Sequence, residues 1–141
     1  MQGHPLGVPG LTIGLLGGSF DPPHEGHVHI TKIAIKIFNL SRLWWLVSPG
    51  NPIKDKAPSD INKRFLASKK IMQHPSVTIT DIEKKLKTKF TFQTLIKIRK
   101  LYPGTRFVWL MGADNLVNFH HWENWGWIMK NVPIGVLARP K

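Results

Sequence analysis

Short apolar runs alternate along the chain with segments whose apolar residues recur at helical spacing. Continuous apolar runs are typical of buried strands, whereas apolar residues three or four positions apart indicate one face of a helix. On this basis the chain is expected to contain strands at 11–18, 42–50, 76–80, 106–112 and 132–140, helices at 27–40, 59–73 and 91–103, and a Trp-rich segment at 116–130.

Capping and breaking residues support the helix boundaries. Ser59 or Asp60 is expected to cap the second helix, because short polar side chains accept hydrogen bonds from the first free N–H groups. Pro103 is expected to end the third helix, since proline cannot continue the hydrogen-bonding pattern.

The alternation of strand and helix predicts an α/β fold: a Rossmann-like, doubly wound parallel sheet of about five strands with helices on both faces. Ligands of such sheets bind beyond the carboxyl ends of the strands, where the strand order reverses. Three polar loops follow predicted strands, at 17–27, 49–58 and 112–122. We therefore expect the functional residues in these loops.

A chain of 141 residues is long enough for one domain with a hydrophobic core. We expect a flexible tail at 1–10 and a single domain at 11–141. No apolar run reaches the length of a membrane span, and the N-terminus lacks the pattern of a signal peptide. The sequence contains no cysteine, which excludes disulfides and thiolate metal sites and favours a reducing, cytoplasmic location.

The charge is strongly positive, with 20 Lys and Arg residues against 8 Asp and Glu residues and a net charge of +12. Thirteen of the basic residues lie between Lys54 and Lys100, together with only four acidic ones. Such an excess favours an anionic partner, but a solvated basic face explains the charge equally well. Charge alone does not decide between them.

The segment "GGSFDPPHEGH" at 17–27 carries the clearest chemistry. Gly17 and Gly18 remove side chains at the end of a strand, so that a ligand can approach the backbone N–H groups. The following helix N-terminus attracts anions. His24 and His27 can donate hydrogen bonds to phosphate oxygens, and Gly26 leaves room between them. This pattern predicts a nucleotide phosphate site.

Two other interpretations of this loop remain. In one, the glycines serve only a tight turn beside surface histidines; in the other, His24, His27 and His29 bind a metal. Zinc requires three or four converging ligands, and no nearby carboxylate or thiolate completes such a set. The loop is not a P-loop, because no Gly-Lys-Ser/Thr follows the glycine pair.

The loop resembles the signature of the nucleotidyltransferase superfamily that carries the HxGH motif. "FTFQTL" at 90–95 and "GADNLVNFHHW" at 112–122 make the chain similar to the bacterial nicotinate-nucleotide adenylyltransferase family. "WWLVSPGNPIK" at 44–54 resembles its alphaproteobacterial branch. The resemblance extends from about residue 12 to the end of the chain.

The resemblance implies that the phosphate of nicotinate mononucleotide attacks the α-phosphorus of ATP and releases pyrophosphate, without a protein nucleophile. It implies that His24 and His27 are catalytic, holding ATP phosphates and stabilising the transition state. Mg²⁺ is the implied cofactor, carried mainly by the phosphates and not by protein ligands. The implied ATP and phosphate set comprises Gly17, Gly18, Ser19, Phe20, Gly26 and Lys54.

For the second substrate, the resemblance implies a site for the nicotinate nucleotide and its ribose formed by Asn51, Thr91, Gly112, Asp114 and Trp122. Thr91 is expected near the nicotinate carboxylate, Trp122 on the pyridine ring and Asp114 at ribose hydroxyls. From the residues alone, Trp122, Trp125 and Met129 predict a buried helical face. The resemblance favours Trp122 facing the ligand and Trp125 in the core.

The remaining expectations concern the end of the chain and other functions. Family members carry an "ISSTxIR"-like motif near the C-terminus that this sequence lacks, so the domain is expected to be truncated there. A pantetheine-phosphate adenylyltransferase is the alternative enzyme, and a non-catalytic nucleotide- or RNA-binding domain is the alternative of another class. We expect ATP and nicotinate mononucleotide as partners, with no nucleic acid and no membrane. His120 and His121 are expected at the surface.

Overall fold

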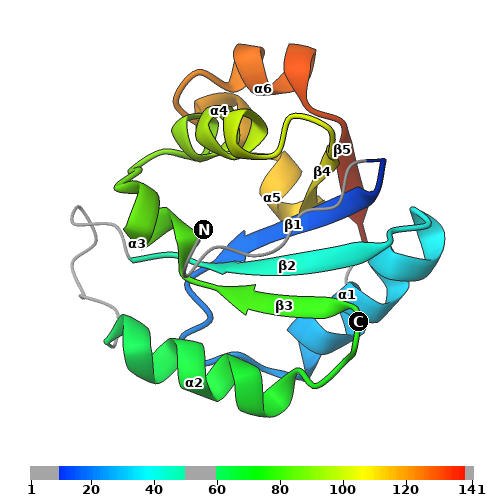
Figure 1. Cartoon of the computed structure of the whole chain (residues 1–141), viewed down its shortest axis with the longest axis vertical. Helices are drawn as coiled ribbons and strands as arrows, with labels where there is room; N and C mark the ends of the chain where they lie inside the picture. The colour runs from blue at the N-terminus through cyan, green and yellow to red at the C-terminus, as the bar shows by residue number, and fades with distance from the viewer. Residues whose placement is uncertain (1–9, 50–59, 139–141) are drawn as a thin grey trace.

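The computed structural model describes residues 10–49 and 60–138, which form one parallel sheet covered by helices (Figure 1). Its strands are β1 (Thr12–Gly18), β2 (Arg42–Val47), β3 (Val77–Thr80), β4 (Arg106–Gly112) and β5 (Ile134–Leu137). Its helices are α1 (Glu25–Ile37), α2 (Ile61–Ile71), α3 (Ile82–Leu86), α4 (Thr91–Leu101), α5 (Ala113–Leu116) and α6 (Trp125–Asn131), with a 3₁₀ turn η1 (Phe119–His121).

The strand order is β3-β2-β1-β4-β5, and every neighbouring pair is parallel. The chain proceeds outward from β1 to β3, then returns to place β4 on the other side of β1. The order therefore reverses between β1 and β4, whose carboxyl ends lie side by side. A crevice at this position is the usual ligand site of doubly wound sheets.

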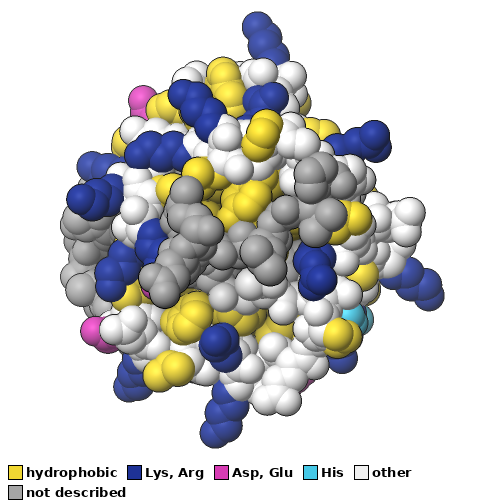
Figure 2. Space-filling model, viewed as in Figure 1, with side chains coloured by type: hydrophobic (Ala, Val, Ile, Leu, Met, Phe, Trp, Pro, Cys, Tyr) yellow, Lys and Arg dark blue, Asp and Glu magenta, His cyan; other side chains and the backbone are white. Residues whose placement is uncertain are grey.

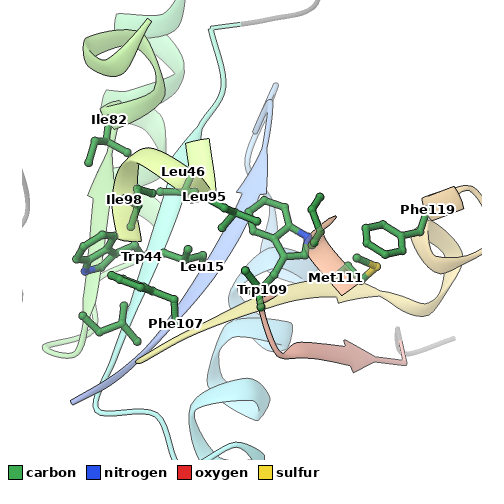
Figure 3. Close-up of a cluster of buried hydrophobic side chains, with 13 residues drawn as sticks. Leu15, Trp44, Leu46, Ile82, Leu95, Ile98, Phe107, Trp109, Met111 and Phe119 are labelled. Carbon is green, nitrogen blue, oxygen red and sulfur yellow. The ribbon is translucent and has the colours of Figure 1, made fainter. Parts of the chain in front are cut away.

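Both faces of the sheet are buried, because successive strand residues point to opposite sides. One core contains Leu15, Trp44 and Trp109 beneath α4 and α6 (Figure 3). The other contains Leu16 and Trp45 beneath α1 and α2. Helices on both faces confirm the predicted doubly wound architecture.

The predicted strands and helices are all present within the described residues, with ends trimmed by a few positions. The first helix begins at Glu25, two residues before its expected start, because His24 caps it. Asp60 caps α2 through its carboxylate, which accepts from Asn62 N–H at 2.7 Å. The short α3 was not predicted, since five residues do not show a helical period.

Several expectations fall outside the described residues. They concern the tail at 1–9, Asn51, Lys54 and Ser59. Among the described helices, none is both long and apolar enough to cross a membrane. Lys and Arg side chains are spread over the face seen in Figure 2, with few acidic ones between them.

Candidate active site

Two segments from opposite halves of the chain meet at the switch point. The first is 19–24, between β1 and α1, and the second begins at Gly112, between β4 and α5. The N-terminus of α4 belongs to the same end of the molecule, because α4 runs antiparallel to the strands that flank it in sequence. Residues predicted from three separate motifs are therefore presented at one edge of the sheet.

His24 is the N-cap residue of α1, a position usually taken by Ser, Thr, Asp or Asn. Its Nδ1 accepts a hydrogen bond from the backbone N–H of Gly26 at 3.0 Å. A Cβ on Gly26 would lie 2.8 Å from Nδ1 and Cε1 of this imidazole. The space that the sequence suggested for a phosphate chain is thus partly filled by the His24 ring, and Gly26 is needed to seat it.

His27 completes a reciprocal pair with His24. Its Nδ1 accepts from the backbone N–H of His24 at 3.1 Å, and the two ring centroids are 3.9 Å apart. A nitrogen that accepts a hydrogen bond carries no proton, so the neutral form of each ring holds its proton on Nε2. Both histidines are thereby fixed in the tautomer that offers Nε2–H as a donor.

An aromatic wall supports the His27 ring. Phe20 is 2% exposed, its ring lies 4.8 Å from the His27 ring, and Trp45 stacks on it at 4.6 Å. Trp45 Nε1–H donates to Thr31 Oγ1 at 2.8 Å, and the Thr31 hydroxyl donates to the His27 carbonyl at 2.7 Å. The position of His27 is therefore set by core residues and not by loop residues alone.

Phe20 adopts a left-handed backbone conformation, with φ of 52°. This region is disfavoured for bulky residues, so burial of the ring against Trp45 must compensate for the local strain. Phe20 was predicted as a phosphate-site residue. Its side chain is instead buried against His27 and Trp45, so it supports the site from behind.

Gly17 and Gly18 end β1, as expected, but each has a packing role. A Cβ on Gly17 would lie 2.7 Å from Cη2 of the buried Trp109 indole, whereas one on Gly18 would make ordinary contact with Phe20 at 3.5 Å. The Gly18 carbonyl accepts from Ser48 N–H at 2.9 Å. Gly17 thus allows the Trp109 indole of β4 to pack closely against the end of β1.

Arg64 was not singled out from the sequence, where it is one of many basic residues. It is 2% exposed on the inner face of α2. Its guanidinium donates to the carbonyls of Ser19 at 2.7 Å, Ser48 at 2.6 Å and Pro49 at 3.5 Å. No local signal distinguishes this arginine, because its partners are 15 to 45 residues away in sequence.

The second half of the site follows β4. Gly112 is buried and caps α5, and Asp114 is exposed in the first turn of that helix. Trp122 is half-buried and makes edge contacts with Trp109 at 6.0 Å and Phe119 at 5.1 Å. Trp122 is therefore held by aromatic neighbours, with part of its surface remaining accessible.

The expectation that Trp125 lies in the core is wrong. Trp125 is 41% exposed and Met129 is 54% exposed, whereas Ile128 is fully buried. Trp122 lies before α6 begins, so the three residues do not share one helical face. The buried side of α6 is set by Ile128 and Val132, one turn apart. His120 and His121 are exposed, as predicted.

Thr91 is the first residue of α4 and is half-buried. The turn before it is fixed by Gln93, whose Oε1 accepts from the backbone N–H of Lys89 at 3.0 Å and of Phe90 at 3.1 Å. Thr94 and Thr88 share a buried hydroxyl hydrogen bond of 2.7 Å. These contacts hold the start of α4, including Thr91, in a defined orientation.

Glu83 in α3 is the acidic residue with a strongly altered titration. Burial raises its pKa from 4.5 to about 7, because the charged carboxylate loses hydration.

Metal ligation is not evident from clustering: within residues 10–49 and 60–138, no group of three His, Cys, Asp or Glu side chains could hold an ion. His29, the third residue considered for a metal, is exposed.

Comparisons with known proteins show which family the chain resembles. The model of the cytidylyltransferase-like family matches residues 15–141. A protein of Ruegeria sp. named "Probable nicotinate-nucleotide adenylyltransferase" is 62% identical over 130 residues, covering 92% of this chain and 69% of that protein. A protein of Cereibacter sphaeroides with the same name is 58% identical over 130 residues, covering 92% and 70%.

A similar solved structure is that of Plasmodium falciparum nicotinic acid mononucleotide adenylyltransferase complexed with NaAD. It aligns with a TM-score of 0.74 at 18% identity, over 93% of this chain and 76% of that one. At this identity the likeness concerns the fold.

Proposed function

We propose a role for individual residues below, on the premise that the chain belongs to the nicotinate-nucleotide adenylyltransferase family, within the cytidylyltransferase-like group. The reaction of this family is adenylyl transfer from ATP to nicotinate mononucleotide in NAD biosynthesis, and it is the function of this chain. The role of each residue described below is our proposal.

The phosphate of nicotinate mononucleotide attacks the α-phosphorus of ATP. A new oxygen–phosphorus bond forms as the bond to the bridging oxygen of the β-phosphate breaks, and pyrophosphate leaves with that electron pair. No proton transfer to a protein nucleophile is required. Catalysis then consists of aligning two anions and stabilising the charge on the equatorial oxygens.

His24 and His27 provide that stabilisation through their Nε2–H groups. The observation that carries this proposal is the reciprocal bonding of the pair, in which each Nδ1 accepts a backbone N–H at about 3 Å. Both rings are thereby preorganised as donors before ATP binds, so that little reorganisation accompanies the reaction. The N-terminus of α1 adds a favourable potential for the phosphates.

The nicotinate nucleotide binds across the crevice from these histidines. Thr91 and the first N–H groups of α4 receive the nicotinate carboxylate, and the accessible part of Trp122 contacts the pyridine ring. Asp114, exposed at the start of α5, accepts hydrogen bonds from the ribose hydroxyls. Gly112 has no side chain, so the substrate can approach its backbone closely. Asn51 and Lys54 would extend the site from the loop after β2.

ATP enters as its Mg²⁺ complex, so the ion is written here as part of the substrate. Mg²⁺ retains several waters and is commonly held by substrate phosphates with few protein carboxylates. We also place the reaction in the cytoplasm, which suits a chain without cysteine.

The test is pyrophosphate release from MgATP with nicotinate mononucleotide as the second substrate. We expect turnover by the wild-type chain and a loss of about 100-fold or more in His27→Ala. His29→Ala is the matched control, since His29 is exposed on the same helix, and it should retain wild-type turnover. Equal losses in both variants would overturn the role of His27.

The alternative functions are tested in the same assay. Replacing nicotinate mononucleotide by phosphopantetheine tests the pantetheine-phosphate reaction, for which we expect no pyrophosphate release. Binding to a single-stranded oligonucleotide tests the polynucleotide hypothesis, and such binding would weaken steeply with salt. Turnover with phosphopantetheine but not with nicotinate mononucleotide would show that the proposed second substrate is wrong.

A further inference from the structure

Arg64 connects the two loops that border the phosphate site. Ser19 follows β1, while Ser48 and Pro49 follow β2, and the carbonyls of all three accept from one guanidinium. In Figure 1 the segment after β1 passes α2 on its way to α1. The hydrogen bond from Arg64 joins Ser19 of this segment to α2. One side chain therefore spans the carboxyl ends of two neighbouring strands.

These carbonyls lie where the sheet ladder ends. The last ladder-like contact is the hydrogen bond from Ser48 N–H to the Gly18 carbonyl at 2.9 Å. Beyond it, Ser19 and Ser48 are half-buried, and a carbonyl withdrawn from water requires a donor. Arginine suits this place because its planar fork presents several N–H donors at fixed angles, and its charge attracts the oxygen ends of the peptide dipoles.

The segment that contains Ser19 is connected to His27 through the next residue along the chain. The next residue, Phe20, has the left-handed φ of 52°, and its ring lies 4.8 Å from His27. A shift of the Ser19 peptide would rotate the Phe20 backbone and move the ring that supports His27. Arg64 itself reaches no reacting atom through these contacts, so any effect on catalysis passes through the loop.

We propose that Arg64 is a positioning residue for adenylyl transfer: it fastens the loops after β1 and β2 and so fixes His27 in its donor orientation. This inference rests on the proposed function of His27. Arg64 also places a fixed positive charge beneath the loops that receive two anionic substrates, where burial weakens solvent screening. Its role differs from that of a general stabilising residue because its three carbonyl partners all lie in the loops beside the proposed phosphate site.

Arg64→Lys and Arg64→Met test the proposal. Lysine keeps the charge but cannot donate to three carbonyls with a planar fork, and methionine keeps much of the length without charge. We expect kcat to fall about tenfold to hundredfold in Arg64→Lys and further in Arg64→Met, because small displacements of catalytic groups have effects of this size. The Tm and the kcat are measured on the full 141-residue chain.

Met72→Ala is the matched control. Met72 is 5% exposed at the end of α2, and its apolar side chain packs in the core that contains Phe20 and Trp45. It should lower the Tm while the folded protein keeps its kcat. If Arg64→Lys lowers only the Tm, as Met72→Ala does, Arg64 is structural and the proposal is overturned.

Binding of a non-hydrolysable ATP analogue separates this proposal from the proposed function. If the wild-type chain binds the analogue but shows no turnover, the proposed function fails. The Arg64 proposal then still predicts about tenfold weaker analogue binding by Arg64→Lys than by Met72→Ala. Equal binding by these two variants would overturn it. Turnover by wild type with unchanged kcat in Arg64→Lys would overturn the Arg64 role alone.

Discussion

The Nδ1 atom of His27 accepts the backbone N–H of His24 at 3.1 Å, and the two imidazoles lie 3.9 Å apart. One histidine thus acts as the helix cap, and the other binds the backbone of that cap. The same hydrogen bonds that begin α1 select the tautomer of both rings. Helix capping and the orientation of the two groups that we propose as phosphate donors are therefore one structural feature, and changes to the first turn should alter activity.

Replacement of Gly26 by alanine should separate activity from stability. The new Cβ would lie 2.8 Å from the His24 ring, which must move. We expect pyrophosphate release to fall at least tenfold, while the helix itself gains up to about 1 kcal/mol from the better helix former. Steady-state kinetics and denaturant unfolding would measure both effects.

Gly126→Ala is the control for this change, because a Cβ there meets nothing within 4 Å. It should leave turnover unchanged. Comparable losses of turnover in Gly126→Ala and Gly26→Ala would contradict the account of the His24 ring.

Gly17→Ala should destabilise the fold by about 1–3 kcal/mol through overpacking against Trp109. The indole is 4% exposed, and its Cη2 atom would lie 2.7 Å from the new Cβ, so it has little room to move. Gly18→Ala, whose contacts begin at 3.5 Å, should cost less. Urea unfolding of both variants tests this order.

The same contact can be tested by a double-mutant cycle. Trp109→Phe shortens the ring and should make a second substitution of Gly17 by alanine nearly harmless. Purely additive destabilisation in the double variant would show that the two residues do not interact.

Two substitutions of Gln93 should separate its effect on stability from its effect on substrate binding. Gln93→Ala removes the acceptor of two N–H groups and should lower stability by about 1 kcal/mol. Gln93→Glu keeps an acceptor at the same position, and its charge suits a helix N-terminus, so stability should be retained.

Gln93→Glu should nevertheless raise the KM for nicotinate mononucleotide several-fold, because it brings a second negative charge towards the substrate carboxylate. The KM for ATP should change less. An unchanged KM for nicotinate mononucleotide would indicate that the carboxylate does not bind at the start of α4.

The pH dependence of stability should reveal Glu83. Burial raises its pKa to about 7 in the fold from 4.5, so the folded chain retains a proton that the unfolded chain releases between these values. The free energy of unfolding should therefore decrease as the pH rises from about 4.5 to 7, by up to about 3 kcal/mol. Urea unfolding at a series of pH values measures this slope.

Glu83→Gln should remove this contribution and stabilise the protein above neutral pH. Glu123→Gln, which changes an exposed carboxyl, serves as the control and should retain the slope. The same slope in wild type and Glu83→Gln would show that another group is responsible.

Local patterns were sufficient for the five strands and the three predicted helices, and they pointed to His24 and His27, whereas Thr91, Asp114 and Trp122 came from the family resemblance. The apolar runs located five strands, and the strand–helix alternation led to the doubly wound sheet. His24, His27, Thr91, Asp114 and Trp122 are brought to one edge because parallel strands and their loops obey a general rule. The prediction failed at Trp125, since the direction of so short a helix depends on what packs beneath it and not on spacing.

The sequence by itself determined the element types, the fold class and the family resemblance, because periodicity and contiguous motifs are properties of neighbouring residues. Only the tertiary structure decided that the His24 ring fills the space above Gly26, that Trp109 requires Gly17, and that Arg64 is buried. Each of these results depends on groups that approach one another in space. Arg64 is the clearest case, because its guanidinium meets a carbonyl 45 residues away that no local pattern identifies.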